Sequence, residues 1–259
     1  MTEIERFQFE KIPLSRPRQI EGRVADTAMI AHDTLRIAFE PRSEAMFDFV
    51  PGQYLSLVLQ ADEEQGLRRE LRPYSLWSHP AEGGPAVTVV RLIEGGRASS
   101  LLRSLEPGDD VDFVAPLGSF YLRRPLHPHL HFVATGTGLV PLRSMLLEMA
   151  DKGELEGRET TLWFGVRHEA DLFAMDELRD LESRFSGFRF VPTLSQPGPE
   201  WTGATGRVTD HLRDATFPIE TMQVYLCGNG AMIDEVVTIF EALGLHRQTR
   251  RIVYEKYFG

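Results

Sequence analysis

The pattern of apolar and polar residues changes once along this chain, near Arg123-Arg124-Pro125, and that change constrains the fold more than any other feature. Before it, short alternating segments are separated by Gly, Pro and Asp, which is typical of antiparallel strands. After it, apolar segments alternate with longer helical patterns, which is typical of a parallel, doubly wound sheet. The sequence therefore predicts two domains, residues 1–124 and residues 125–259.

The first domain is expected to be a small antiparallel β-barrel, because six short strands at this spacing favour a closed sheet. Its predicted strands are 18–27, 34–40, 53–60, 71–78, 85–92 and 110–115, with one helix at 97–105. The second domain is expected to be an α/β nucleotide-binding fold. Its predicted strands are 129–134, 160–164, 188–192, 222–227 and 250–256, and its predicted helices are 139–150, 171–183, 206–213 and 230–243.

Composition excludes several classes of protein. The single cysteine, Cys227, excludes an internal disulfide and a four-cysteine zinc or iron–sulfur site within this sequence, so we expect no metal. A net charge of −10 argues against nucleic acid as a partner. No apolar run approaches the roughly 20 residues that span a bilayer, and the N-terminus is polar. We expect a cytoplasmic monomer without a membrane partner.

The segment Arg72-Pro73-Tyr74-Ser75-Leu76-Trp77-Ser78 combines a permanent cation, an aromatic ring and hydroxyl groups on one predicted strand. A guanidinium is well suited to a pyrophosphate because its planar donors match the anion. Side chains on a strand alternate with period two, so Tyr74 shares a face with Arg72 and Ser75 faces the other way. An ordinary strand with a surface arginine is the competing interpretation.

The segment Arg91–Leu102 follows with glycines and hydroxyls at the predicted start of a helix. Free backbone N–H groups and the helix dipole favour an anion there, and Ser99 is the best side-chain candidate. A serine-capped helix after a glycine turn is the simpler interpretation of the same residues.

Two glycine-rich segments follow predicted strands of the second domain. Gly136-Thr137-Gly138-Leu139-Val140-Pro141 is a glycine turn opening a helix, which lets backbone approach a pyrophosphate closely. Pro141 stands where the third glycine of a dinucleotide fingerprint would fall, and proline is tolerated in a first helical turn. Cys227-Gly228-Asn229-Gly230-Ala231-Met232 lies at the carboxyl edge where ligands collect in such sheets.

In this order, the motifs resemble those of the ferredoxin–NADP reductase superfamily, over nearly the whole chain from about residue 20. The resemblance implies FAD on the first domain and a nicotinamide nucleotide on the second. The implied FAD-binding residues are Arg72, Pro73, Tyr74, Ser75, Arg91, Leu92, Ile93, Gly96, Arg97, Ala98, Ser99 and Phe258. The implied NAD(P)-binding residues are Thr135, Gly136, Thr137, Gly138, Pro141, Arg167, Ser195, Cys227, Gly228, Asn229 and Met232.

The resemblance also implies which side chains line the reaction site. Ser75 would lie near the reactive nitrogen of the flavin and Cys227 beside the nicotinamide C4 atom. Glu255 would approach the flavin, with Tyr257 or Phe258 as the aromatic that shields its ring. For Cys227 alone, a buried packing role is the competing interpretation.

The choice of nucleotide depends on a cation for the 2′-phosphate of NADP. Arg167 is the candidate, in the loop after the second predicted strand of the domain. Two observations oppose it: Gln196 stands where strict NADPH users of the family often carry arginine, and Glu169 suits a free ribose hydroxyl. The sequence leans slightly to NADP and leaves NAD open.

The function implied is that of a ferredoxin (or flavodoxin)–NAD(P)H reductase, most specifically ferredoxin–NADP reductase. The nicotinamide C4 atom would give a hydride to flavin N5, and single electrons would then pass to an acidic partner. Candidates for docking that partner are Arg68, Arg69 and Arg97. Alternatives are the reductase component of an oxygenase system, a free-flavin reductase, or a non-catalytic flavin-binding module.

Overall fold

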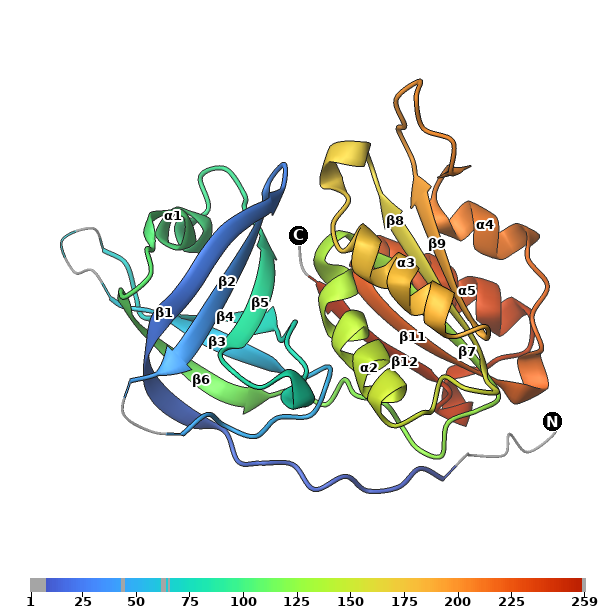
Figure 1. Ribbon diagram of the computed structural model, residues 1–259, viewed down its shortest axis with the longest axis horizontal. Coiled ribbons are helices and arrows are strands. Elements are labelled where there is room, and N and C mark those ends of the chain that lie inside the picture. Colours follow the sequence, from blue (N-terminus) through green and yellow to red (C-terminus); the bar gives the residue numbers. More distant parts are fainter. Residues whose placement is uncertain (1–7, 43–44, 62–63, 65, 258–259) are drawn as a thin grey trace. The chain divides into compact units, whose positions relative to one another are not determined.

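The computed structural model describes residues 8–42, 45–61, 64 and 66–257, and these form two compact units. The first unit contains Ile12–Tyr121 together with Arg143–Glu148, and the second contains residues 8–11, Leu122–Leu142 and residues 149–257. The first is an antiparallel barrel and the second a parallel sheet with helices, as predicted (Figure 1). The predicted boundary after residue 124 lies close to this division and stays a prediction.

The barrel is a six-stranded antiparallel sheet with the strand order β4-β3-β6-β1-β2-β5. Its elements are β1 (Arg18–Ala31), β2 (Thr34–Pro41), β3 (Tyr54–Leu59), β4 (Glu70–Ser75), β5 (Ala86–Arg91), α1 (Arg97–Ser104) and β6 (Asp110–Leu117). The edge strands β4 and β5 approach each other through one bridge, between Leu76 and Thr88. Inward-facing apolar side chains from all the central strands fill the interior, with Phe39, Leu55, Leu57 and Phe113 fully buried. Burial of this core stabilises the framework that holds β4.

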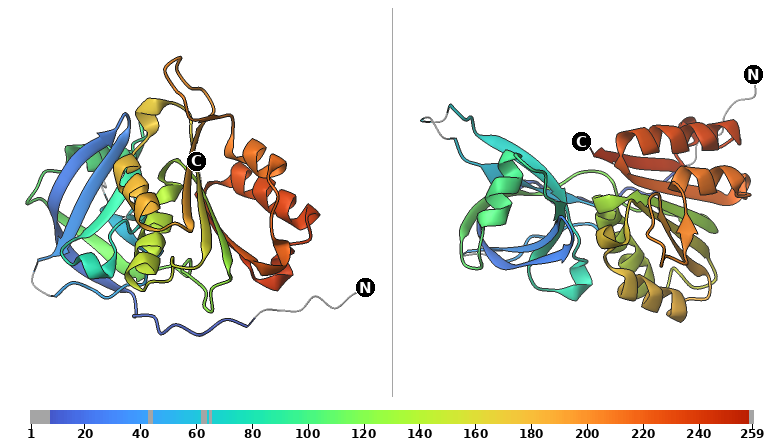
Figure 2. Two further views of the ribbon diagram at one scale, coloured as in Figure 1. Left: turned by 45° about the vertical axis from the view of Figure 1, so that its right-hand side comes forward. Right: turned by 90° about the horizontal axis from the view of Figure 1, so that it is seen from above.

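The second unit is a parallel sheet with the strand order β10-β9-β8-β7-β11-β12. Its strands are β7 (His129–Thr135), β8 (Glu159–Val166), β9 (Phe188–Leu194), β10 (Ala204–Thr205), β11 (Met222–Asn229) and β12 (Ile252–Tyr257). The helices that follow its strands are α2 (Leu139–Asp151), α3 (Met175–Arg184), α4 (Val208–Asp214) and α5 (Gly230–Ala242). Helices α2 and α3 cover one face of the sheet, and α4 and α5 cover the other (Figure 2).

The order of the strands fixes where a ligand can bind in this unit. The first strand, β7, lies between β8 and β11. The chain adds β8, β9 and β10 on one side of β7 and then crosses over to add β11 and β12 on the other side. Ligands in doubly wound sheets bind at such a reversal, beyond the carboxyl ends of the strands. Here those ends carry the two glycine-rich segments found in the sequence.

Three predicted boundaries differ from the structure by three residues or more. Strand β1 continues to Ala31, beyond the predicted residue 27, because two bulges let it keep pairing with β2 up to the turn. Strand β4 ends at Ser75, three residues early. Helix α3 begins at Met175, four residues late, because Glu169–Asp171 forms a separate 3-10 turn and Ala174 is left-handed with a φ of 60°.

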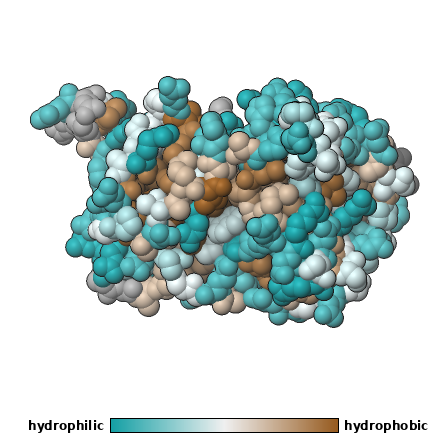
Figure 3. All heavy atoms as spheres, turned by 45° about the horizontal axis from the view of Figure 1, so that its top comes forward, coloured by the Kyte–Doolittle hydropathy of each residue, from teal (hydrophilic) through white to brown (hydrophobic). Residues whose placement is uncertain are grey.

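Polar and charged residues make up most of the surface of each unit on the face that Figure 3 shows, with smaller apolar areas among them. Within the part of the chain that the structure describes, no helix is both long enough and apolar enough to cross a bilayer.

Candidate functional site

Strand β4 presents the predicted flavin residues at an edge of the barrel sheet. Its register with β3 pairs Arg72 with Leu57 and Tyr74 with Leu55, which puts Arg72 and Tyr74 on one face of the strand. Ser75 pairs with Tyr54 and points to the other face, as the alternation of side chains requires. Because β4 has a strand on one side only, its exposed edge is open to a ligand.

The three side chains differ in burial. The Arg72 guanidinium is 47% exposed and contacts the Glu70 carboxylate at 2.6 Å. Tyr74 packs against the apolar core of the barrel, and this burial raises the pKa of its hydroxyl to about 12 against a smaller opposing effect of Arg72. Ser75 is 6% exposed, and its carbonyl accepts a hydrogen bond from the Thr88 hydroxyl. The strand therefore offers an exposed cation beside a neutral, immobilised ring.

Helix α1 begins at Arg97 after Gly96, which provides no side-chain cap. The Ser99 hydroxyl oxygen accepts a hydrogen bond from the backbone N–H of Ile93 at 2.8 Å, which closes the glycine turn onto the helix. The backbone N–H groups of the first turn thus have no side-chain oxygen as a cap, as an anion-binding helix start requires. Leu92 is buried and Ile93 is 61% exposed beside this turn.

Two predicted FAD ligands direct their side chains elsewhere. The guanidinium of Arg91 pairs with Asp33 at 2.7 Å. That of Arg97 donates to the carbonyl oxygens of Arg68, at 2.7 Å, and of Gln60. Two donors of the Arg97 guanidinium are therefore held within the chain, and its role in docking an acidic partner stays a prediction.

The exposed edge of β4 and the uncapped start of α1 fit an FAD molecule. The guanidinium of Arg72 and the N–H groups of α1 suit a pyrophosphate, and Tyr74 offers a flat apolar surface for a ring. Glu70, which pairs with Arg72, also belongs to this site, although the sequence motifs did not include it. Its position two residues before Arg72 puts it on the same face of the strand, and this spacing could have identified it.

In the second unit, the glycine turn after β7 packs tightly on the end of β11. A β-carbon on Gly138 would lie 2.1 Å from the carbonyl oxygen of Cys227. A β-carbon on Gly228, where φ is +133°, would lie 2.3 Å from the Thr135 hydroxyl. The same hydroxyl accepts a hydrogen bond from the backbone N–H of Asn229 at 3.0 Å. Glycine is needed at both positions so that the two glycine-rich segments can meet.

Cys227, Glu255 and Tyr257 come together through the parallel pairing of β11 with β12. The register places Cys227 opposite Glu255 and Asn229 opposite Tyr257. The thiol is fully buried and hydrogen-bonds the Tyr257 side chain. Burial, and then the Glu255 carboxylate, raises the pKa of the Cys227 thiol well above its ordinary value. It is therefore a neutral thiol at physiological pH and a poor nucleophile. Phe258 lies outside the described residues.

Two predicted nucleotide ligands have structural roles. The Asn229 side chain caps α5 by accepting hydrogen bonds from the N–H groups of Ala231, at 2.9 Å, and Met232, at 3.3 Å. Met232 is 8% exposed and belongs to the apolar core between the sheet and α5. Pro141 lies in the first turn of α2. A backbone N–H at this position would have no acceptor within the helix, so proline costs no hydrogen bond there.

The loops after β8 and β9 lie side by side. The backbone N–H of Gln196 donates to the carbonyl of Arg167 at 2.9 Å, and that of Ser195 donates to Val166 at 3.1 Å. Arg167 and Ser195 are both exposed. Both oxygens of the Glu169 carboxylate accept from the backbone N–H of Gly198, at 2.9 and 3.1 Å. This use of Glu169 removes most of the sequence argument for a ribose hydroxyl there.

Comparison with known families assigns both units. A family of oxidoreductase FAD-binding domains matches residues 21–121, and a family of oxidoreductase NAD-binding domains matches residues 132–238. Ferredoxin–NADP reductase B of Sorangium cellulosum is 34% identical, over 83% of this chain and 88% of the relative. The chain belongs to the ferredoxin–NADP reductase family.

Other members of this family resemble the chain as strongly. The electron transfer component of toluate 1,2-dioxygenase from Pseudomonas putida is 29% identical, over 92% of this chain and 67% of the relative. The crystal structure of the Amycolatopsis cytochrome P450 reductase GcoB is 31% identical and superposes with a TM-score of 0.79, over 93% of this chain and 70% of that one. The chain spans about half to two thirds of the length of the oxygenase components that it matches.

Proposed function

We propose that this protein is an FAD-dependent NAD(P)H reductase that delivers electrons to a ferredoxin or flavodoxin. The observation that supports it most is that one chain carries both half-sites, each with the backbone geometry that its ligand requires. These are the exposed edge of β4 with the uncapped start of α1, and the turn at Gly136–Gly138 beside Cys227. We also propose that the protein is a cytoplasmic monomer.

The proposed roles in the FAD half follow from the positions of the side chains. Arg72 would neutralise the pyrophosphate together with the N–H groups of α1, and Tyr74 would support the ring. Ser75 would donate a hydrogen bond to the flavin from the opposite face of β4. FAD, when bound, supplies the exchange between a two-electron donor and one-electron acceptors.

The proposed roles in the nucleotide half use the end of the parallel sheet. The turn at Gly136–Gly138 would bind the pyrophosphate through backbone N–H groups. The neutral thiol of Cys227 would pack beside the nicotinamide, while Glu255 and Tyr257 on β12 would control how the ring enters. None of these residues would form a covalent bond, which agrees with the raised pKa of Cys227.

We propose NADPH as the preferred donor. Arg167 is exposed at the carboxyl edge of the sheet, where a 2′-phosphate would need a cation. Both oxygens of the Glu169 carboxylate already accept from the Gly198 N–H, which makes Glu169 a weaker candidate for a ribose hydroxyl.

A second candidate is the reductase component of an oxygenase system. The relatives favour it, because several of them are electron transfer or reductase components of dioxygenases and monooxygenases. The two candidates share the FAD and nucleotide sites and differ only in the protein that receives the electrons.

The first test is anaerobic stopped-flow reduction of the FAD-loaded protein, followed at the flavin absorbance band with NADPH and NADH in parallel. Fast bleaching by one nucleotide would support the proposal and identify the donor. Absence of bleaching by both, in protein that retains FAD, would contradict it and favour a non-catalytic flavin-binding module. The reduced protein is then mixed with a ferredoxin or with an oxygenase component. Reoxidation by the ferredoxin would support the first candidate function, and reoxidation by the oxygenase component alone would support the second.

A further inference from the structure

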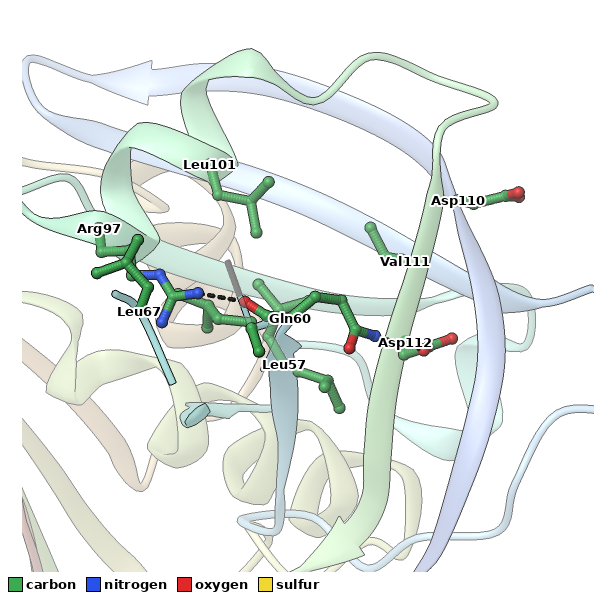
Figure 4. A pocket seen from close by; sticks show the side chains of 11 residues that line it. Leu57, Gln60, Leu67, Arg97, Leu101, Asp110, Val111 and Asp112 are labelled. Atoms are coloured by element: carbon green, nitrogen blue, oxygen red, sulfur yellow. Dashed lines mark hydrogen bonds between the residues drawn. The ribbon is translucent and has the colours of Figure 1, made fainter. Parts of the chain in front are cut away.

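Arg97 is the first residue of α1, but its side chain is directed to the loop end of the β3–β4 hairpin. One terminal nitrogen donates to the carbonyl of Arg68 at 2.7 Å. The other donates to the carbonyl of Gln60, which Figure 4 shows. Gln60 directly follows β3 and Arg68 lies just before β4, so the guanidinium joins the two strands where their ladder ends. The last ladder pair before this point is Leu59 with Glu70.

The guanidinium forms one wall of a cavity of about 530 Å³ between α1, β3 and β6. Leu57, Leu59, Leu101 and Val111 supply apolar walls of this cavity, and Asp110 and Asp112 lie across from Arg97. Helix α1 packs on the barrel core through Leu102, and the hydrogen bonds from Arg97 add a polar link between the start of α1 and the hairpin. This polar link is one that a single substitution can remove.

The Glu70 carboxylate connects the Arg97 side chain to Arg72, the residue proposed to bind the pyrophosphate of FAD. Glu70 lies 3.9 Å from Arg97 through one carboxylate oxygen and 2.6 Å from Arg72 through the other. The three charges thus form a row from the start of α1 to the middle of β4. Only the backbone of Arg97 is left to face an anion at the helix start.

We propose that Arg97 is a positioning residue for the FAD site, which fixes strand β4 and the Arg72 side chain relative to the N–H groups of α1. Without it, the end of β4 loses its link to α1, and Arg72 and the helix start no longer hold a constant separation. A pyrophosphate bridging the two would then bind a less ordered site, which lowers affinity. The inference rests on the proposed flavin role of β4.

The test measures FAD affinity of the apoprotein by flavin fluorescence for Arg97→Ala, Arg97→Lys and the matched control Arg103→Ala. Arg103 is an exposed arginine in the last turn of the same helix. We expect Arg97→Ala and Arg97→Lys to weaken FAD binding roughly tenfold, the effect of losing charge-assisted hydrogen bonds. Lysine keeps the charge but lacks the planar fork that spans two carbonyls. Arg103→Ala should bind as the wild type does.

Two further readouts identify the mechanism. In the Arg72→Ala background, Arg97→Ala should add little, because the residue that it positions is already gone. Hydrogen exchange of the β4 amides in the apoprotein should accelerate in both Arg97 variants. Wild-type affinity in Arg97→Lys would show that charge alone matters, and full additivity with Arg72→Ala would show an independent role; either result would overturn the inference.

These outcomes are distinct from failure of the proposed function. A wild-type protein that binds FAD and is reduced by NAD(P)H, alongside Arg97 variants with unchanged affinity, would sink the positioning role alone. If Arg97→Ala does not fold, Arg97→Lys and the exchange rates of β4 decide the question.

Discussion

At the scale of single residues, the proposed preference for NADPH rests on one guanidinium, that of Arg167. Arg167 is exposed beyond the carboxyl end of β8, and its backbone carbonyl is fixed by the N–H of Gln196. Its backbone is therefore anchored by the neighbouring loop. The absence of arginine at Gln196 leaves Arg167 as the residue on which discrimination between the two nucleotides would rest.

We expect Arg167→Ala to raise the KM for NADPH roughly tenfold or more and to leave the KM for NADH nearly unchanged. The reason is that a charge-assisted contact to phosphate is lost only for the phosphorylated nucleotide. Steady-state kinetics with both donors measures this. Arg189→Ala, an exposed arginine at the amino end of β9, is the control. Equal increases for both nucleotides would rule out the assignment.

At the scale of elements, Asn229 at the start of α5 has two possible roles, as the cap of the helix or as a ligand of the nucleotide. Asn229 accepts two hydrogen bonds from the first turn of the helix, as a capping side chain does. We expect Asn229→Ala to lower the free energy of unfolding by about 1 kcal/mol, and Asn229→Asp to preserve most of it. Urea denaturation checks this. An unchanged stability with a raised KM for the nucleotide would show that Asn229 is a ligand instead.

The contact between the β7 turn and the end of β11 is a second property of elements. A methyl group on Gly138 would collide with the Cys227 carbonyl at 2.1 Å, and backbone cannot move away as a flexible side chain can. We expect Gly138→Ala to destabilise the protein by at least about 2 kcal/mol and to weaken nucleotide binding. Gly230→Ala is the matched control, since its β-carbon would meet only Lys256, at 3.8 Å. Equal effects of the two substitutions would contradict this explanation.

At the scale of the whole molecule, a buried histidine makes stability depend on pH. Burial, and then the neighbouring His129, lowers the pKa of His131 to about 4 from 6.5. Its Nδ1 accepts a hydrogen bond from the indole N–H of Trp163 at 3.4 Å, and its ring packs edge-on against Phe217 at 5.0 Å between centroids. The surroundings therefore favour the neutral imidazole in the folded state.

The unfolded chain binds a proton at this histidine below pH 6.5, whereas the folded chain does so only near pH 4. Stability contributed by neutral His131 is thus present above about pH 6.5 and lost as the pH falls towards about 4, by roughly 3 kcal/mol. Denaturation curves across this range test it. His131→Asn should flatten the acidic limb, and His246→Asn, at an exposed position, should not. An unaltered acidic limb in His131→Asn would refute the prediction.

The alternation of residues was enough to predict both fold classes, and nearly all the strands and helices, because it is a local property that survives in the final structure. The motif positions could be found for the same reason: glycines mark turns, and Arg72, Tyr74 and Ser75 share one strand. What the sequence could not predict was whether each side chain in a motif is available to a ligand. Arg97 is used by carbonyls 29 and 37 residues earlier in the chain, and Glu169 by an N–H 29 residues later.

The sequence by itself therefore determined the order of the main elements and the family, and it predicted where ligands would bind. Only the tertiary structure decided that Arg97, Asn229 and Glu169 bind backbone groups of the protein itself, that Arg72 and Arg91 each pair with a carboxylate, and that Arg167 is exposed. The physical reason is that a polar side chain takes the partner nearest in space. Strand pairing and helix packing, which join distant parts of the sequence, determine what that partner is.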